Sequence, residues 1–247
     1  MATQKFVVFC AIYSTFLQRA YDQLIHDVAL QNLPVIFCLD RAGLVGEDGA
    51  THHGVFDLAY LRGIPNLIIA APSNEIQLRQ LLYTAQSGLK NPMIIRYPRG
   101  RGVLKEWKVP FEKMRIGKGF QLKEGSAIAV LSIGNMAENV KMAISGLNEE
   151  SKIAHYDMLF VKPLDEKLLS DILNNFTKIL TVEDGVTQGG FGSAVLEFAA
   201  KRNFNAEIIN LGIPDRFIEH GKVKELQEIA GIHVEGIRKK LKAMIGV

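Results

Sequence analysis

Apolar runs with the length of buried strands recur along the chain and alternate with stretches of helical periodicity. The apolar runs predict strands over residues 6–12, 35–39, 67–71, 93–96, 127–132, 152–156, 179–182 and 207–210. The helical spacing predicts helices from Thr15 to about Val28, over 55–62, 74–86, 136–147, 165–174 and 193–201, and twice within 221–245. Thr15 and Gln18 also have the spacing of a capping box at the start of the first helix. This alternation is typical of an α/β fold in which mostly parallel sheets have helices on both faces.

The stretch from about Gly100 to Gly119 interrupts the alternation. It contains Pro110, several charges and the only tryptophan, Trp107, without a sustained period. Such a stretch is typical of an interdomain linker. We therefore expect two tandem α/β domains, over residues 1–112 and 113–247.

The composition indicates a globular protein and argues against nucleic-acid and membrane partners. The 247 residues are 48% hydrophobic and carry a formal net charge of +3, which is far from the clustered basic surface of a nucleic-acid-binding protein. No apolar run approaches the roughly 18 residues that span a bilayer. Cys10 and Cys38 lie in predicted strands without the spacing of a metal or redox pair. We expect no metal site in this chain and a reducing, cytoplasmic setting.

A glycine-rich, charged loop follows the predicted strand 35–39 and is the strongest candidate for a ligand site. It contains Arg41, Asp48 and His52 among four glycines, Gly43, Gly46, Gly49 and Gly54. Loops at the carboxyl ends of parallel strands face a common crevice, and glycines let a ligand approach the backbone closely.

Arginines at two strand ends predict a phosphorylated small substrate. Arg41 follows one strand, and Arg96 and Arg99 lie in the sequence Arg96-Tyr97-Pro98-Arg99-Gly100 at the end of another. The planar guanidinium group suits bidentate binding of phosphate. The alternative is that each arginine pairs with a nearby acidic residue.

The loop histidine and its neighbours suggest acid–base chemistry. His52 can exchange protons near neutral pH, so it is a candidate proton donor to a reacting hydroxyl. Asp48 either orients His52, binds a substrate hydroxyl or simply forms an Asp-Gly turn. His53 is expected to be exposed or structural.

Two further features of the sequence have competing interpretations. Tyr13 and Phe16 form either an aromatic wall of the same crevice or part of the core. Thr187–Gly192 is glycine-rich but lacks a phosphate-loop fingerprint, and we expect a tight strand-to-helix turn there.

Four segments together resemble the 1-deoxy-D-xylulose-5-phosphate synthase family: Ala11–Gln23, Asp40–His52, Arg96–Gly100 and Pro214–Ile218. The pattern Gly46-x-Asp48-Gly49-x-Thr51-His52 is shared with transketolases broadly. The first and third segments narrow the resemblance to the synthase. The third segment, Arg96–Gly100, also argues against another transketolase-like protein, such as transketolase itself or the β subunit of a 2-oxoacid dehydrogenase.

The resemblance implies a cytoplasmic, homodimeric transferase of isoprenoid and thiamine biosynthesis. It uses thiamine diphosphate and Mg²⁺ to decarboxylate pyruvate and add the two-carbon unit to glyceraldehyde 3-phosphate. Arg41 and Arg99 would hold the aldehyde phosphate, and Tyr13, Asp48 and His52 would line the substrate site, with His52 as the catalytic residue. Phe16 would stack on the aminopyrimidine of the cofactor.

The resemblance is to the later part of the pyrimidine-binding domain and to the C-terminal domain. We expect the domain that binds Mg²⁺ and diphosphate, and the Ala-Glu-Gln-His motif whose glutamate activates the cofactor, to lie outside this chain. The chain alone is then expected to be inactive and to expose a sheet edge, with a separate N-terminal piece as a possible partner. The alternative is a non-catalytic transketolase-like module for binding or assembly.

Overall fold

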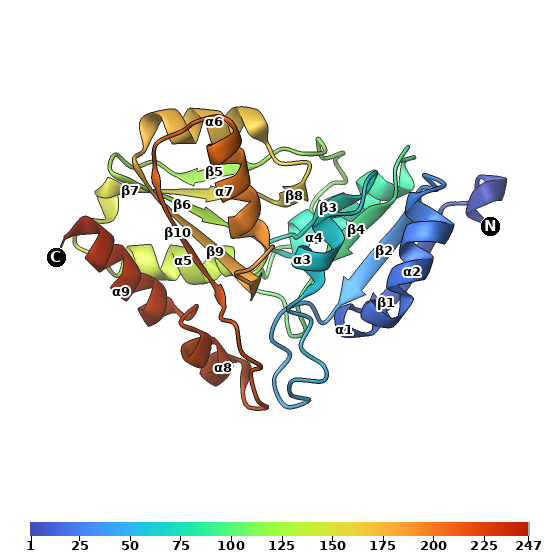
Figure 1. The fold of residues 1–247 in the computed structure, drawn as a ribbon, viewed down its shortest axis with the longest axis horizontal. Helices are drawn as coiled ribbons and strands as arrows, with labels where there is room; N and C mark the ends of the chain where they lie inside the picture. The colour runs from blue at the N-terminus through green and yellow to red at the C-terminus, as the bar shows by residue number, and fades with distance from the viewer. Residues whose placement is uncertain (247) are drawn as a thin grey trace.

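The computed structural model describes residues 1–246 and consists of two five-stranded sheets that lie side by side (Figure 1). The first sheet has the strand order β1-β2-β4-β3-β8. Its first four strands are parallel, whereas β8 joins antiparallel to β3. These strands are β1 (Val8–Tyr13), β2 (Val35–Asp40), β3 (Ile68–Ala70), β4 (Met93–Arg96) and β8 (Phe160–Lys162).

The second sheet has the strand order β10-β9-β6-β7-β5, and only β5 is antiparallel to its neighbour. Its strands are β5 (Phe120–Lys123), β6 (Ile128–Ser132), β7 (Ile153–Asp157), β9 (Lys178–Val186) and β10 (Glu207–Ile213). The predicted α/β fold with mostly parallel sheets is confirmed.

The larger helices form where the sequence predicts them. They are α3 (Asp57–Arg62), α4 (Glu75–Gln86), α5 (Met136–Ser145), α6 (Glu166–Asn175), α7 (Phe191–Lys201), α8 (Val223–Ala230) and α9 (Val234–Ile245). Side chains cap two of them, because Asn74 accepts the Gln77 N–H of α4 and Asp165 accepts the Leu168 N–H of α6. Within Thr187–Gly192, residues 187–190 form the expected turn between β9 and α7, which begins at Phe191.

Apolar clusters cover both faces of the first sheet. Alternate residues of β2 belong to different clusters, Phe37 and Leu39 to one and Ile36 and Cys38 to the other. The first cluster also contains residues of the second sheet, such as Ile179. The two sheets therefore share one core. No helix in the described part of the chain is long and apolar enough to cross a membrane.

The segment after β1 differs from the single helix that the sequence predicts. It consists of α1 (Ser14–Leu17), a 3₁₀ turn, α2 (Tyr21–Gln23) and a π-helical stretch over Leu24–Ala29. The predicted capping box is wrong, because the Thr15 hydroxyl donates to the Thr51 carbonyl at 3.1 Å instead. This bond links the start of the segment to the loop that precedes α3.

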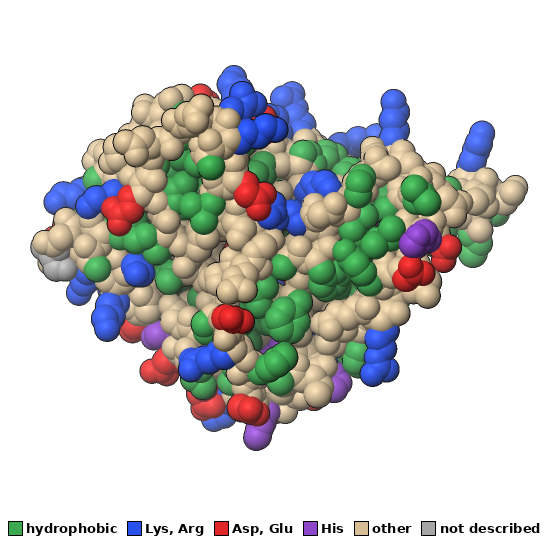
Figure 2. Space-filling view, viewed as in Figure 1, with side chains coloured by type: hydrophobic (Ala, Val, Ile, Leu, Met, Phe, Trp, Pro, Cys, Tyr) green, Lys and Arg blue, Asp and Glu red, His purple; other side chains and the backbone are tan. Residues whose placement is uncertain are grey.

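β1 lies at the edge of its sheet and is only partly buried, so the prediction of a buried strand there is wrong. Within the described residues it pairs with β2 alone, and Phe9 is 44% exposed. On the face in Figure 2, apolar side chains gather over the first sheet and its helices, whereas most Lys and Arg side chains lie near the rim.

Candidate functional site

The loop between β2 and α3 is closed at its base by two hydrogen bonds. Gly43 and Gly54 exchange N–H to carbonyl bonds of 2.8 Å in each direction. Gly43, Gly46 and Gly49 have φ angles of 75°, 96° and 71°, which favour glycine. The glycines thus let the chain fold back on itself, so that Asp48 and His52 lie on the same closed loop.

Three aromatic rings from three segments meet beside this loop. Tyr13 at the end of β1 stacks on Phe16 of α1 with ring centroids 5.3 Å apart. The Phe16 ring also meets the His52 imidazole edge-on at 5.5 Å. Phe16 is 43% exposed, so it belongs to an accessible aromatic cluster rather than to the core. We call Tyr13, Phe16 and His52 the aromatic cluster.

Arg41 connects the aromatic cluster to a cavity. Its guanidinium carbon lies 3.9 Å from the centroid of the Tyr13 ring, and Nη1 donates to Asp40 Oδ2 at 2.8 Å. The backbone of Arg41 has a φ of 57°, which turns the chain sharply where β2 ends. The side chain therefore lies between Asp40 and Tyr13.

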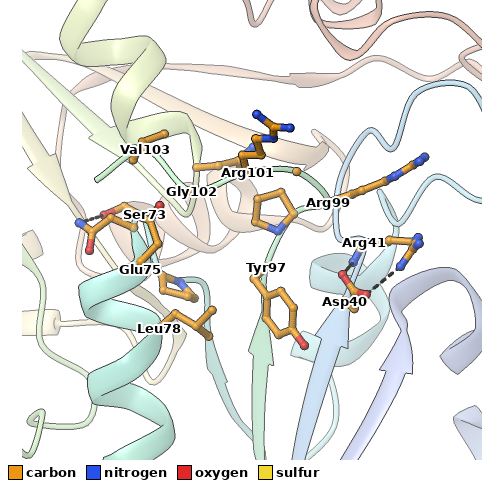
Figure 3. Close-up of a pocket in the computed structure, with 15 residues that line it drawn as sticks. Asp40, Arg41, Ser73, Glu75, Leu78, Tyr97, Arg99, Arg101, Gly102 and Val103 are labelled. Carbon is orange, nitrogen blue, oxygen red and sulfur yellow. Dashed lines mark hydrogen bonds and ion pairs between the residues drawn. The ribbon is translucent and has the colours of Figure 1, made fainter. Parts of the chain in front are cut away.

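The cavity has a volume of about 430 Å³ and is lined by Arg41, Arg99, Arg101, Asp40 and Tyr97, together with the start of α4. Arg41 and Arg99 extend the same way from neighbouring turns, whereas Arg101 extends away from both (Figure 3). Burial, with Cys38 and Asp40 nearby, raises the pKa of Tyr97 to about 12. Its hydroxyl group therefore stays protonated at neutral pH and is available as a hydrogen-bond donor.

Asp48 pairs with Arg99 and not with His52. The Arg99 Nη1 donates to Asp48 Oδ2 at 3.0 Å, and both side chains are more than 40% exposed. His52 Nδ1 instead lies 2.9 Å from the Thr51 hydroxyl. Both candidate phosphate ligands, Arg41 and Arg99, thus have acidic partners. The Arg99–Asp48 pair is exposed and contributes at most about 1 kcal/mol, so a phosphate dianion can compete with it, whereas the Arg41–Asp40 pair is partly buried.

Arg96 is buried and is not available to a substrate in the cavity. Only 3% of the residue is exposed, and its Nε donates to Asp57 Oδ2 at 2.8 Å. Burial disfavours its charge, but the adjacent Asp57 together with Asp184 and Glu183 outweighs this effect and raises the pKa of Arg96 above its usual value. The phosphate-binding interpretation of Arg96 is wrong, and the alternative of an acidic partner is confirmed.

Two buried polar residues around the loop, Asp57 and Asp184, could not be predicted from the sequence, whereas His53, expected to be exposed or structural, is buried and structural. His53 Nδ1 accepts the Val45 N–H at 3.1 Å, so its Nε2 donates to the Glu219 carbonyl at 3.2 Å. Burial raises the pKa of Asp184, against the effects of Arg96, Asn135 and the Leu44 N–H. No signal in the sequence could have paired Asp184 with a loop some 140 residues earlier.

The site fits part of a thiamine cofactor. The exposed face of Phe16 offers a stacking surface for an aromatic ring. Among residues 1–246, no group of three or more Asp, Glu, His or Cys side chains could hold a metal ion. The exposed ring of Phe16 therefore fits the stacking of an aminopyrimidine ring.

Comparison of the sequence with protein families finds two matching domains. Residues 1–103 match "Transketolase, pyrimidine binding domain" and residues 117–237 match "Transketolase, C-terminal domain". The 1-deoxy-D-xylulose-5-phosphate synthase of Bacteroides thetaiotaomicron is 56% identical over 98% of this chain. That of Aquifex aeolicus is 52% identical over 94% of it. The chain spans only 38% and 37% of the lengths of these two relatives.

Two solved structures share the fold. A structure titled "Split gene transketolase, inactive beta4 tetramer" matches 99% of this chain and 77% of its own, with a TM-score of 0.85 and 25% identity. The transketolase of Campylobacter jejuni matches 96% of this chain and 36% of its own, with a TM-score of 0.69 and 18% identity. Both aligned regions contain the two sheets described above.

Proposed function

Because this chain belongs to the transketolase family and contains its pyrimidine-binding and C-terminal domains, we propose that it is part of a 1-deoxy-D-xylulose-5-phosphate synthase. The proposed reaction joins pyruvate to glyceraldehyde 3-phosphate and releases CO₂. The proposal is supported by the identity of 56% to such a synthase over nearly the whole chain. The observation that carries it is that Arg41 touches both the aromatic cluster and the cavity that Arg99 lines.

In this proposal the two arginines bind the phosphate of the aldehyde substrate. Each guanidinium group exchanges its carboxylate partner, Asp40 or Asp48, for the phosphate oxygens. Tyr97 adds a neutral hydrogen-bond donor at the same cavity. The carbon end of the substrate then points toward the aromatic cluster, because Arg41 also contacts Tyr13.

His52 is proposed to supply a proton to the aldehyde oxygen as the new carbon–carbon bond forms. Its Nδ1 is engaged by Thr51, which leaves Nε2 for the substrate. Phe16 holds the aminopyrimidine ring by stacking. When bound, thiamine diphosphate supplies the nucleophilic carbon that attacks pyruvate and accepts the electrons released with CO₂.

We propose that turnover needs a further domain that binds diphosphate and Mg²⁺, in the same polypeptide or in a separate one. The chain spans 38% of its relative, and the described residues contain no cluster of three or more Asp, Glu, His or Cys side chains that could hold a metal ion. The split-gene neighbour, whose title calls its tetramer inactive, aligns with 99% of this chain. In the complete assembly we propose the homodimer that the family resemblance implies.

The test is complementation with the N-terminal part of the Bacteroides thetaiotaomicron synthase. We expect no release of CO₂ from pyruvate and glyceraldehyde 3-phosphate with the chain alone, and turnover when both pieces are mixed. Calorimetry should show no micromolar binding of thiamine diphosphate and Mg²⁺ to the chain alone. Micromolar binding would overturn the proposed inactivity. Failure of two properly folded pieces that form a complex would instead support the non-catalytic module.

A further inference from the structure

The carboxylate of Asp184 holds the base of the loop that carries Asp48 and His52. Asp184 lies on β9 in the second sheet and is 1% exposed. Its Oδ1 accepts the Leu44 N–H at 3.2 Å, and its Oδ2 accepts the Asn135 side-chain amide at 3.3 Å. A side chain of the C-terminal domain thus binds the backbone of the pyrimidine-binding domain.

The backbone of the loop packs directly against the Asp184 carboxylate at Gly43. Gly43 has a φ of 75°, and a Cβ atom built on it would overlap the Asp184 carboxylate. The same Gly43 closes the loop by its two bonds to Gly54. Any displacement of the Asp184 side chain therefore acts on the base of the loop.

A buried guanidinium group extends this contact to the aromatic cluster. Arg96 Nη2 donates to the Asp184 carbonyl at 3.1 Å while its Nε binds Asp57. The same Asp57 oxygen accepts the Ser14 hydroxyl at 3.0 Å, and Ser14 directly follows Tyr13. One buried network thus contacts the loop and the ends of β1 and β4.

The other end of the loop also rests on the C-terminal domain. His53 donates to the Glu219 carbonyl, and the Gly221 N–H donates to the Gly46 carbonyl at 3.4 Å. In Figure 1 this loop lies next to the segment that leads into α8. The loop is therefore held at its base by Asp184 and farther along by residues 219–221.

We propose that Asp184 is a positioning residue through which the C-terminal domain sets the geometry of residues 41–54. Burying three carboxylates, Asp57, Glu183 and Asp184, around one arginine is costly, and this cost is offset only where hydrogen bonds of good geometry satisfy each group. Asp184 does not line the cavity that contains Arg41 and Arg99. It acts through the Leu44 backbone and the Gly43 turn.

Hydrogen exchange of the folded chain tests this proposal without enzyme activity. In Asp184→Ala the amides of residues 42–54 should exchange about tenfold faster, since one buried hydrogen bond at the loop base is lost. In Asp184→Asn the remaining side-chain oxygen still accepts the Leu44 N–H. The Asn135 side chain can flip so that its oxygen accepts a hydrogen bond from the new amide group. That variant should stay within about threefold of wild type.

Asp165→Ala provides a matched control in the same domain. Asp165 is also buried, at 5% exposure, and accepts the Leu168 and Gly119 N–H groups. Its loss should speed exchange near residues 119 and 168 and leave residues 42–54 unchanged. If Asp184→Ala does not fold, Gly43→Ala keeps the carboxylate and should produce the same local increase. Wild-type exchange over 42–54 in folded Asp184→Ala, or in folded Gly43→Ala, would overturn the proposal.

A kinetic test rests additionally on the proposed function. In the complemented enzyme, Asp184→Ala should raise KM for glyceraldehyde 3-phosphate about tenfold, and Asp184→Asn should restore most of it. A merely structural loss would lower the amount of active enzyme, and hence kcat, without changing KM. If the complemented wild type shows no turnover, the proposed function fails while the exchange result still decides the role of Asp184.

Discussion

The guanidinium group of Arg41 lies over the ring of Tyr13, with 3.9 Å between the guanidinium carbon and the ring centroid. The same guanidinium binds Asp40 at 2.8 Å. A planar cation suits both contacts at once, because it can stack on an aromatic face while its edge donates hydrogen bonds. Arg41 therefore joins the aromatic cluster to the cavity by its shape as well as by its charge.

Replacing Arg41 by Lys should weaken binding of glyceraldehyde 3-phosphate although the charge is kept. The lost stacking and fork geometry should cost about 1 to 2 kcal/mol, roughly a 5- to 30-fold rise in KM in the complemented enzyme. A double-mutant cycle with Tyr13→Ala separates the stacking from the charge, since Arg41→Lys should cost less once the ring is gone. Strictly additive effects would show that the two side chains act independently.

Replacing Arg99 by Ala should raise KM for the same substrate. The rise should correspond to a loss of about 1.5 to 3 kcal/mol in binding free energy, as expected for a charged hydrogen bond. Steady-state kinetics of the complemented enzyme measures this effect. Arg115→Ala removes an exposed arginine that does not line the cavity and should leave KM unchanged. An unchanged KM in Arg99→Ala would remove the proposed phosphate-binding role.

Phe16→Ala should lower the affinity of the complemented enzyme for thiamine diphosphate. Stacking between aromatic rings adds about 0.5 to 1.5 kcal/mol to the effect of buried area, so we expect a loss of at least fivefold in calorimetry. Phe120→Ala is the matched control, because Phe120 is 41% exposed, against 43% for Phe16, but lies in β5. Equal effects of the two substitutions would argue for a general loss of stability instead.

Arg96→Met should destabilise the fold by about 3 to 5 kcal/mol, because it leaves the buried carboxylate of Asp57 without its partner. Urea unfolding of the isolated chain measures this directly. The comparison is Arg202→Met, which removes an exposed pair with Glu166 of similar length, 2.9 Å. That change should cost less than about 1 kcal/mol. Similar losses in both variants would contradict the structural role of Arg96.

Local patterns in the sequence predict most of this fold. Asn74 and Asp165 act as helix caps through neighbours a few residues away, and β4 spans the apolar run that the sequence shows. β8 could not be predicted, because a strand of three residues is defined by its pairing with β3 in the other domain. Whether β1 is exposed likewise depends on what lies beside it and not on its own apolar residues.

The candidate site could be predicted only in part. Residue type and position at strand ends placed Arg41, Asp48, His52 and Arg99 near one another, since parallel strands end at one edge. The same reasoning could not separate Arg96 from them. Arg96 differs from the other arginines because Asp57 of α3 binds it. The hydrophobic pattern of the sequence does not show which way α3 faces.

Two buried groups in the second sheet, His155 and Glu183, make the stability of the fold depend on pH. Burial lowers the pKa of His155 to about 4, and the imidazole contacts the Ser132 hydroxyl at 2.8 Å. The unfolded state takes up this proton near pH 6.5, so the folded state loses stability through His155 as the pH falls from about 6.5 toward 4. Burial raises the pKa of Glu183 to about 7, against its bonds from Phe191 and Gly192. Glu183 therefore contributes with the opposite sign, and the fold gains stability through it as the pH falls from about 7 toward 4.5.

Because the effects of His155 and Glu183 oppose one another, the pH dependence of the free energy of unfolding of the wild type does not reveal either effect. Replacing each residue by Gln isolates its effect. As the pH falls from 6.5 to 5, the free energy of unfolding of His155→Gln should rise by about 2 kcal/mol relative to that of wild type. Over the same change in pH, the free energy of unfolding of Glu183→Gln should fall by a similar amount relative to wild type. Urea unfolding at both pH values measures the two differences. A relative change of the same sign in both variants would contradict the assigned burial effects, since desolvation acts oppositely on a buried base and a buried acid.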